Sequence, residues 1–171
     1  TIDSKLQQYA IESIEKNLYI YDKRHGWREP KNLLSRIPEL VFKELQKGNL
    51  DVLYEESNTE DKLGMRQLNI SVIRDLFAEL LNLDKHSGGI VIDIKPERVT
   101  YLSNTFQLES FFWNDTYKWA RQRININKFG PRPQNFYDIL RLGDLIYLSD
   151  LNGAIYLDQV PEAEVAFIST D

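Results

Sequence analysis

The stretch that decides the fold runs Gly143-Asp144-Leu145-Ile146-Tyr147-Leu148 and then, after three residues, Asn152-Gly153-Ala154-Ile155-Tyr156-Leu157. Its two runs are rich in aliphatic and aromatic residues, the composition typical of β-strands. The dipeptide between them, Asn-Gly, is the one that best tolerates the positive φ angles of a tight hairpin turn. The stretch therefore predicts two antiparallel strands joined by that turn.

An alternating pattern upstream predicts further strands. Ile90, Ile92 and Ile94 alternate with other residues, so we expect their side chains to point to one face of a sheet. The pattern continues with a turn at Pro96-Glu97-Arg98, a strand with Val99 and Tyr101, a turn at Asn104 and a strand with Phe106 and Leu108. The total is about five strands, the number with which a small Greek-key barrel hides its edges. A last strand is expected over residues 165–168.

Helical periodicity predicts three helices outside these strands. The first is capped near Thr1 and ends at His25-Gly26, and its apolar positions are Leu6, Ala10, Ile14, Leu18 and Tyr21. The second begins at Pro38 and stops at Gly48, and the third is capped by Ser71 and carries apolar residues through Leu81. Residues 55–62 are mostly acidic and polar and predict a solvated loop. The fold class is α+β, a small barrel of about five strands with accessory helices and an N-terminal helix.

The composition of the chain excludes some classes of function and argues against others. The chain has 171 residues, of which 42% are hydrophobic, so it can form one domain with appendages. A formal charge of −5 argues against nucleic acid as a partner, because nucleic-acid-binding surfaces are usually basic. Cysteine is absent, which excludes disulfides and thiolate chemistry. We expect no membrane segment in this chain, because no run of apolar residues is long enough to cross a bilayer.

Catalytic and metal sites are not predicted. Ser13-Ile14-Glu15-Lys16 matches the short Ser-x-x-Lys pattern of transpeptidase nucleophiles, but no Ser-x-Asn or Lys-Thr-Gly element accompanies it. His25 and His86 are the only histidines and lie in unrelated turns, where we expect His25 to order its turn through a hydrogen bond. We therefore expect no catalytic residue, no cofactor and no metal.

Several segments of the chain resemble one known family. Those near the start are Thr1-Ile2-Asp3, Leu6-Gln7, Ala10, Leu18, Tyr21-Asp22 and a turn signature of Arg24, His25, Gly26, Trp27 and Arg28. They resemble the start of the transpeptidase region of bifunctional class A penicillin-binding proteins, although Glu29-Pro30 stands where the family usually has Gly-Pro. Those in the second half are Trp119-Ala120-Arg121, Gly130-Pro131, Asp138-Ile139-Leu140, Gly143-Asp144 and Leu157-Asp158-Gln159-Val160-Pro161-Glu162. They resemble the OB-like domain that is inserted next in that family.

The resemblance implies a non-catalytic OB-like regulatory or docking domain of a peptidoglycan synthase, on the periplasmic side of the bacterial inner membrane. A glycosyltransferase domain precedes this region in the family and the transpeptidase core follows it. Residues 1–30 would then be the N-terminal helical segment of the transpeptidase region, residues 31–160 the OB-like domain with a helical insertion near 33–83, and residues 161–171 a returning strand. Such an insertion implies that Gly26 and Val165 lie close together. The implied partners are the other domains of the synthase and, as in some members, an activating outer-membrane lipoprotein.

One stretch leaves the kind of partner open. Aromatic and basic residues alternate over it, and its candidate docking or structural residues are Phe111, Phe112, Trp113, Trp119, Arg121, Arg123 and Arg132. OB folds bind single-stranded nucleic acids with such a mixture, and exposed aromatic rings also bind glycans such as peptidoglycan. Aromatic and arginine side chains equally anchor protein interfaces, which the negative net charge favours. For Trp119 and Arg121 we favour structural roles, with Trp119 packed in the core and Arg121 in an ion pair.

Overall fold

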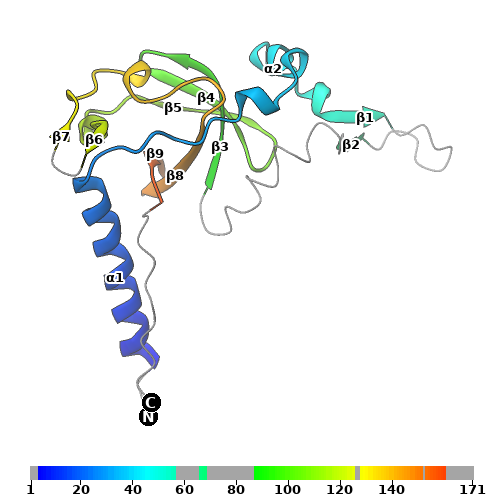
Figure 1. Ribbon diagram of the computed structural model, residues 1–171. Coiled ribbons are helices and arrows are strands. Elements are labelled where there is room, and N and C mark those ends of the chain that lie inside the picture. The colour runs from blue at the N-terminus through cyan, green and yellow to red at the C-terminus, as the bar shows by residue number, and fades with distance from the viewer. Residues whose placement is uncertain (1–3, 57–65, 69–86, 126–127, 152, 161–171) are drawn as a thin grey trace.

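A computed structural model of the chain describes residues 4–56, 66–68, 87–125, 128–151 and 153–160. Its main element is an antiparallel sheet of five strands in the order β5-β4-β3-β8-β9 (Figure 1). The strands are β3 (Ser87–Lys95), β4 (Arg98–Ser103), β5 (Leu108–Phe112), β8 (Leu145–Leu151) and β9 (Ala154–Asp158). Because β8 returns to lie beside β3, strands β8, β3, β4 and β5 have the order of a Greek key.

The predicted turns between these strands are present, but Arg98 already belongs to β4, and Phe106, which we expected in a strand, lies in the turn before β5. β3 and β4 pair up to Lys95 opposite Arg98, so the turn holds only Pro96 and Glu97. β8 and β9 pair up to Leu151 opposite Ala154. Gly153 in the turn between them has a φ angle of +81°, the left-handed conformation for which the Asn-Gly prediction called.

The expectation that Ile90, Ile92 and Ile94 share one face is wrong at Ile94. Ile90 and Ile92 pack on one face of the sheet, whereas Ile94 packs on the other face beside Val91. The pairing of β3 with β4 shifts register between Val91 and Asp93, so Ile92 is the extra residue of a β-bulge. One inserted residue reverses the alternation for the rest of the strand, because side chains alternate with a period of two.

The predicted α+β class is confirmed, and the sheet is a curled half-barrel of the OB-like kind. Within the described residues, the edge strands β5 and β9 pair with β4 and β8 but not with each other. The edge of β9 instead forms a hydrogen bond with a side chain. The Leu157 backbone amide donates to the hydroxyl of Tyr117 at 3.1 Å. Tyr117 lies in η4 (Asp115–Trp119) and is 1% exposed. A buried tyrosine therefore satisfies a backbone donor that strand pairing satisfies in a closed barrel.

Helices and two short hairpins surround this sheet. The first two predicted helices are confirmed as α1 (Ser4–Arg24) and α2 (Glu39–Gln46). The short 3-10 helices η1 (Leu34–Arg36) and η2 (Leu50–Leu53) lie before and after α2, and η5 (Phe136–Asp138) comes later in the chain. The hairpins are β1 (Tyr54–Glu56) with β2 (Arg66–Leu68) and β6 (Arg123–Asn125) with β7 (Lys128–Phe129).

One loop prediction fails at its start. The predicted loop over residues 55–62 is wrong for Glu55 and Glu56, because backbone pairing with β2 places these polar residues in a strand. The rest of that loop, the predicted helix from Ser71 to Leu81 and the predicted strand over residues 165–168 lie outside the described residues.

Two buried clusters cover the two faces of the sheet. We call one the aliphatic cluster: Leu33, Ile37, Val41, Phe42, Leu45, Leu53, Ile90, Ile92, Leu102 and Leu145. We call the other the aromatic cluster: Trp27, Val91, Val99, Tyr101, Phe111, Tyr117, Ala120, Phe136, Ile139, Leu140, Ile146, Leu148 and Leu157. The first packs α2 and its flanking turns on the sheet. The second fills the half-barrel.

Candidate functional site

The incoming and outgoing segments of the domain meet at one buried polar network. Gln159 follows β9, and its side-chain amide donates to the Asp22 carboxylate at 2.7 Å and to the Gly26 carbonyl at 3.0 Å. Its side-chain oxygen accepts a hydrogen bond from the Arg28 backbone at 3.2 Å. Arg28 completes the network through an ion pair with Asp22. We call Asp22, Arg28 and Gln159 the clasp.

Burial makes the clasp specific. Asp22 is 8% exposed and Gln159 is 6% exposed. A polar atom of either side chain that lost its hydrogen-bond partner would remain unpaired, because water does not reach it. The guanidinium of Arg28 also donates to the Val160 carbonyl, which ties the outgoing chain directly to the incoming one. The end of α1 therefore lies beside residues 159–160. Val165, which we expected near Gly26, is outside the described residues.

The turn signature explains how the incoming chain reaches this position. Gly26 has a φ angle of +87°, and a Cβ there would lie 2.7 Å from the Arg121 carbonyl, so the turn requires glycine. Trp27 next to it is 4% exposed and its indole N–H donates to the Ile139 carbonyl at 3.0 Å. Trp27 thus anchors the incoming segment in the aromatic cluster. Arg24 is exposed on the last turn of α1.

The expected hydrogen bond of His25 is present. Its Nδ1 lies 2.8 Å from the Tyr21 carbonyl, and the His25 and Tyr21 rings are in contact at a tilt of 41°, with centroids 4.2 Å apart. His25 therefore orders the turn at the end of α1. Among the described residues, no group of three or more histidine, aspartate or glutamate side chains could hold a metal ion. His86 lies outside them.

A second set of contacts fixes α1 to the end of β9. Lys23 forms an ion pair with Asp158 at 3.1 Å, and its ammonium lies 5.3 Å from the centre of the Trp119 ring. Trp119 in turn contacts the edge of Trp27, with centroids 5.6 Å apart. Trp119 is half-buried and packs against the aromatic cluster, in agreement with the structural role that we favoured.

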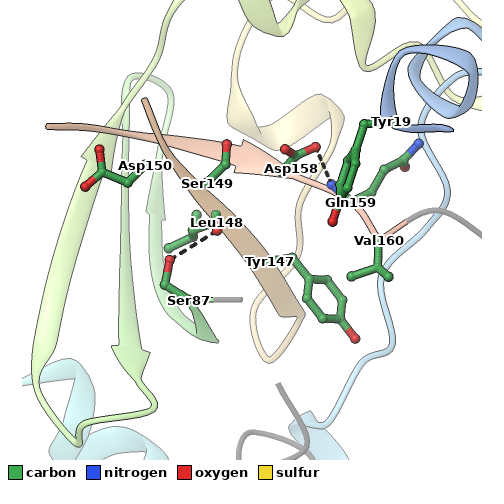
Figure 2. A pocket seen from close by; sticks show the side chains of 9 residues that line it. All are labelled: Tyr19, Ser87, Tyr147, Leu148, Ser149, Asp150, Asp158, Gln159 and Val160. Atoms are coloured by element: carbon green, nitrogen blue, oxygen red, sulfur yellow. Dashed lines mark hydrogen bonds between the residues drawn. The ribbon is translucent and has the colours of Figure 1, made fainter. Parts of the chain in front are cut away.

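An open groove of about 420 Å³ lies beside the clasp (Figure 2). Tyr19 from α1 and Val160 from the outgoing chain stand on one side of it, and Ser87 of β3, residues of β8 and β9, and Gln159 form the rest. Burial raises the pKa of the Tyr19 hydroxyl, and the nearby carboxylates of Asp158, Glu15 and Asp22 raise it further. The groove is thus lined by hydroxyl and carboxylate groups at the junction of α1 and the sheet.

The aromatic and basic stretch is divided between core and surface. Phe111 is 2% exposed in the aromatic cluster, whereas its neighbour Phe112 is 67% exposed. Trp113 is half-buried and makes edge contacts with Tyr117 and Phe136. Strand alternation separates Phe111 from Phe112, because successive side chains point to opposite faces. The stretch is therefore not a continuous platform of exposed rings.

The ion pair expected for Arg121 is absent from the described part of the chain. The Arg121 guanidinium donates to the Gly130 carbonyl at 2.8 Å and lies 5.6 Å from the centre of the Phe129 ring. A backbone carbonyl and an aromatic face thus replace the expected carboxylate. Arg123 is half-buried in β6, with its amide donating to the Trp27 carbonyl, and Arg132 is exposed.

The clasp itself was missed at the level of sequence. Asp22 and Gln159 both occur in the segments that carry the family resemblance, but nothing in their spacing shows that they bind each other.

The exposure of α1 was also missed. Its apolar residues point to solvent, with Leu6 and Tyr9 66% and 65% exposed and Ile14 and Tyr21 45% and 59% exposed. Tyr19, Asp22 and Lys23, on the other side of the helix, make the contacts with the sheet described above.

A Greek-key half-barrel of this strand order, with accessory helices, defines an OB-like domain. Residues 58–163 match the model of the penicillin-binding protein OB-like domain, so the chain belongs to that family. It is thus an OB-like domain rather than a catalytic one.

Curated relatives agree with this assignment. The chain is 28% identical over 175 residues to penicillin-binding protein 1A of Vibrio cholerae, a match that covers 99% of this chain and 18% of the relative. It is 26% identical over 176 residues to penicillin-binding protein 1A of Pseudomonas aeruginosa, covering 100% of this chain and 17% of the relative. It is also 26% identical over 172 residues to penicillin-binding protein 1A of Escherichia coli K12, covering 99% of this chain and 17% of the relative. The chain thus spans less than a fifth of the length of these relatives. In its described residues, no helix is both long and apolar enough to cross a membrane.

Proposed function

We propose that this chain is the non-catalytic regulatory and docking domain of a bifunctional peptidoglycan synthase. It positions the glycosyltransferase and transpeptidase domains and offers a surface to a protein partner on the periplasmic side of the inner membrane. In this proposal residues 1–30 and 161–171 belong to the transpeptidase region, and residues 31–160 form the inserted domain with its helical insertion near 33–83.

The observation that carries the proposal is the clasp. It holds the end of α1 against Gln159, so a domain built from residues in between leaves its host surface and returns to it at one place. This geometry is what insertion into a loop of another domain requires. Four bonds between buried or half-buried groups give the junction a defined orientation, which a flexible linker would not.

The apolar side of α1 supports the positioning role. Helices with an exposed apolar stripe normally bury it against a neighbour, because apolar surface removed from water stabilises by roughly 25 cal/mol per Å². The stripe contains Leu6, Tyr9, Ile11, Ile14, Ile20 and Tyr21. Since relatives extend far beyond the aligned region, a second domain of the same protein is the natural partner for this face.

Regulation through such a domain has a thermodynamic requirement. A partner activates the synthase only if it binds the active arrangement of the two catalytic domains more tightly than the idle one. A difference of about 1.4 kcal/mol in binding would change the ratio of the two arrangements about tenfold. A rigid junction at the clasp would transmit that difference from the docking surface to the host domain.

The proposal is tested in the full-length synthase. The domain between the incoming and outgoing segments is replaced by a short linker that joins Arg28 to Val160, and glycan polymerisation and peptide cross-linking are measured with and without the activating lipoprotein of the same organism. We expect basal glycan polymerisation to persist and stimulation by the lipoprotein to be lost. Stimulation that survives the deletion would contradict the docking role.

A single-stranded nucleic-acid-binding module and a glycan-binding module are the alternative functions. Base stacking needs several exposed rings along one groove. Phe111 and Tyr117 are buried and Trp113 is half-buried, which leaves Phe112 as the exposed ring of that segment. Titration with an oligonucleotide and with peptidoglycan fragments distinguishes these alternatives from protein docking.

A further inference from the structure

Three side chains form a row across the end of the sheet. Lys95 of β3 lies directly opposite Arg98 of β4, and Arg98 lies directly opposite Phe112 of β5. Opposed residues of antiparallel strands place their side chains on the same face. We call Lys95, Arg98 and Phe112 the Phe112 row. It lies on the face of the sheet that carries the aliphatic cluster, because Arg98 is four residues from Leu102 along β4.

Arg98 has an unusual environment in this row. Its Nε is buried and has no hydrogen-bond partner, and it is the one such side-chain atom that the described residues contain. A buried donor without an acceptor is destabilising by about 1–3 kcal/mol. Because this atom is closed to solvent, a ligand from outside would meet the terminal nitrogens of the Arg98 guanidinium rather than Nε.

Charge in the row is also unbalanced. Lys95 and Arg98 carry like charges at directly opposed positions, an arrangement that destabilises a sheet. Asp93 lies on the same face opposite Thr100, but in the described structure it forms no ion pair with either cation. Glu97 lies in the turn between them and likewise forms no such pair. A carboxylate from outside, placed between the Lys95 and Arg98 side chains, would relieve the repulsion between the two cations.

Phe112 supplies the apolar part of the same surface. Its ring is 67% exposed on an edge strand, whereas Phe111 before it and Val99 opposite Phe111 are buried on the other face. Phenylalanine and arginine side by side form the composition of binding hot spots in protein interfaces. The row therefore offers a ring and a guanidinium to one ligand.

We propose that the Phe112 row docks an acidic segment of a partner protein in which a carboxylate lies next to an apolar side chain. The carboxylate lies between the Lys95 ammonium and the guanidinium of Arg98, whose terminal nitrogens can donate to it. The apolar side chain packs on Phe112. This inference rests on the proposed docking function and assigns its surface. A single exposed ring favours a protein over a single-stranded nucleic acid, whose binding normally stacks several bases.

Synthetic peptides test the row directly. The 171-residue chain is titrated with a short peptide of glutamates beside leucines, and backbone amide NMR shifts are recorded. Two comparison probes are the same peptide with lysines in place of glutamates and a short single-stranded DNA. We expect shifts at the amides of β4 and β5 around Arg98 and Phe112 with the acidic peptide alone. Equal shifts with the lysine peptide, or shifts in the row with the DNA, would overturn the assignment to an acidic protein segment.

Variants separate the row from non-specific binding. Phe112→Ala and Arg98→Gln should each weaken binding of the acidic peptide about tenfold or more, the usual loss at a hot spot. Leu40→Ala is the matched control, since Leu40 is 73% exposed on α2 and is not part of the row, and it should change nothing. The amide spectrum of each variant shows whether it is folded. Unchanged affinity in folded Phe112→Ala and Arg98→Gln would overturn the proposal.

The full-length synthase distinguishes failure of the row from failure of the docking function. If Phe112→Ala and Arg98→Gln abolish stimulation by the lipoprotein as the domain deletion does, the row is the docking surface. If the deletion abolishes stimulation and both variants retain it, the docking function stands and the row is wrong. If the deletion itself leaves stimulation unchanged, the proposed function fails.

Discussion

The two faces of the sheet are packed in different ways. The aliphatic cluster joins the sheet to one continuous segment, residues 33–53, which folds back on it through α2. The aromatic cluster joins parts that are distant in sequence, from Trp27 on the incoming chain to Leu157 near the outgoing one. Figure 1 shows the consequence, with α2 placed to one side of the sheet and α1 projecting away from the sheet beside the end of β9.

This difference indicates a division of labour. Loss of packing in the aliphatic cluster would loosen a local cover and leave the sheet intact. Loss of packing in the aromatic cluster would release the half-barrel and the clasp together, because Trp27 and Leu157, which lie next to the clasp residues, both belong to this cluster. The two clusters should therefore differ in how far the effect of a substitution spreads.

Phe136→Ala should have the largest effect. Phe136 is fully buried, and its ring contacts those of Phe111, Trp113 and Tyr117. Removal of a buried phenylalanine ring destabilises by about 3–5 kcal/mol, and we expect a lower free energy of unfolding with protection lost throughout the sheet. Urea unfolding and amide hydrogen exchange measure both. Tyr137→Ala is the control, since Tyr137 is 59% exposed, and a loss of the same size there would contradict the role of the cluster.

Leu45→Ala should have a smaller and more local effect. Leu45 is 1% exposed where α2 packs on the sheet, and the cavity should lower stability by about 3 kcal/mol. Hydrogen exchange should accelerate in α2 and η1 while the β8–β9 hairpin stays protected. Equal acceleration in that hairpin would mean that the two clusters unfold as one unit. Leu40→Ala on the exposed side of α2 should change stability by less than about 0.5 kcal/mol.

Gln159→Ala tests the clasp and should lower stability by about 2 kcal/mol. The substitution leaves the Asp22 carboxylate and the Gly26 carbonyl without the donor they share, and such buried groups are costly to leave unpaired. Gln159→Glu should be worse, because it places a second carboxylate beside Asp22. NMR relaxation should show greater motion of α1 in both variants. A motion of α1 that equals that of the unaltered chain would show that the Lys23 and Trp27 contacts suffice to hold the helix.

Asp144 should give a small dependence of stability on pH. Burial raises the pKa of its carboxyl above the ordinary value of 3.8, while hydrogen bonds from the Arg141 backbone and the Asn32 side chain oppose the rise. The folded state then binds the proton more tightly than the unfolded state. The resulting stability is fully present below the ordinary pKa and is lost as the pH rises through the raised one.

Urea unfolding of the unaltered chain and of Asp144→Asn over this pH range tests the sign. The stability of the unaltered chain relative to the variant should fall as the pH rises from 3.8 and then level off. An increase over the same range would mean that the hydrogen bonds outweigh burial. The effect should be smaller than the three above, because these opposing contributions partly cancel.

Local chemistry made much of the fold predictable. The turns at Pro96-Glu97 and Gly153 follow from the residues in them, and the ends of α1 and α2 follow from glycine and proline at their borders. The bulge at Ile92 was not predictable, because the register shift depends on pairing with β4. Ile90, Ile92 and Ile94 are spaced as they would be in a regular strand. The strand at Glu55 was missed because its partner strand overrides the polar composition.

The candidate site was less predictable than the fold. Aromatic and arginine residues in the stretch 111–132 were recognised, but only the pairing of β4 with β5 separates buried Phe111 from exposed Phe112. The partner of the Arg121 guanidinium is a backbone carbonyl. Because every residue has one, the sequence does not show which carbonyl an arginine binds. Asp22 and Gln159 lie more than a hundred residues apart, and their bond exists only because the aromatic cluster brings the two segments together.

Because α1 is long, a small rotation at the clasp would displace the far end of the helix by several ångströms. With 21 residues and a rise of about 1.5 Å per residue, the helix is a lever arm of roughly 30 Å whose pivot is the clasp. A rotation of about 10° at Asp22 and Arg28 would displace the far end by about 5 Å. A displacement of that size equals nearly one helical turn, so a small change at the pivot would suffice to shift whatever packs on the apolar side of α1 by a full row of side chains.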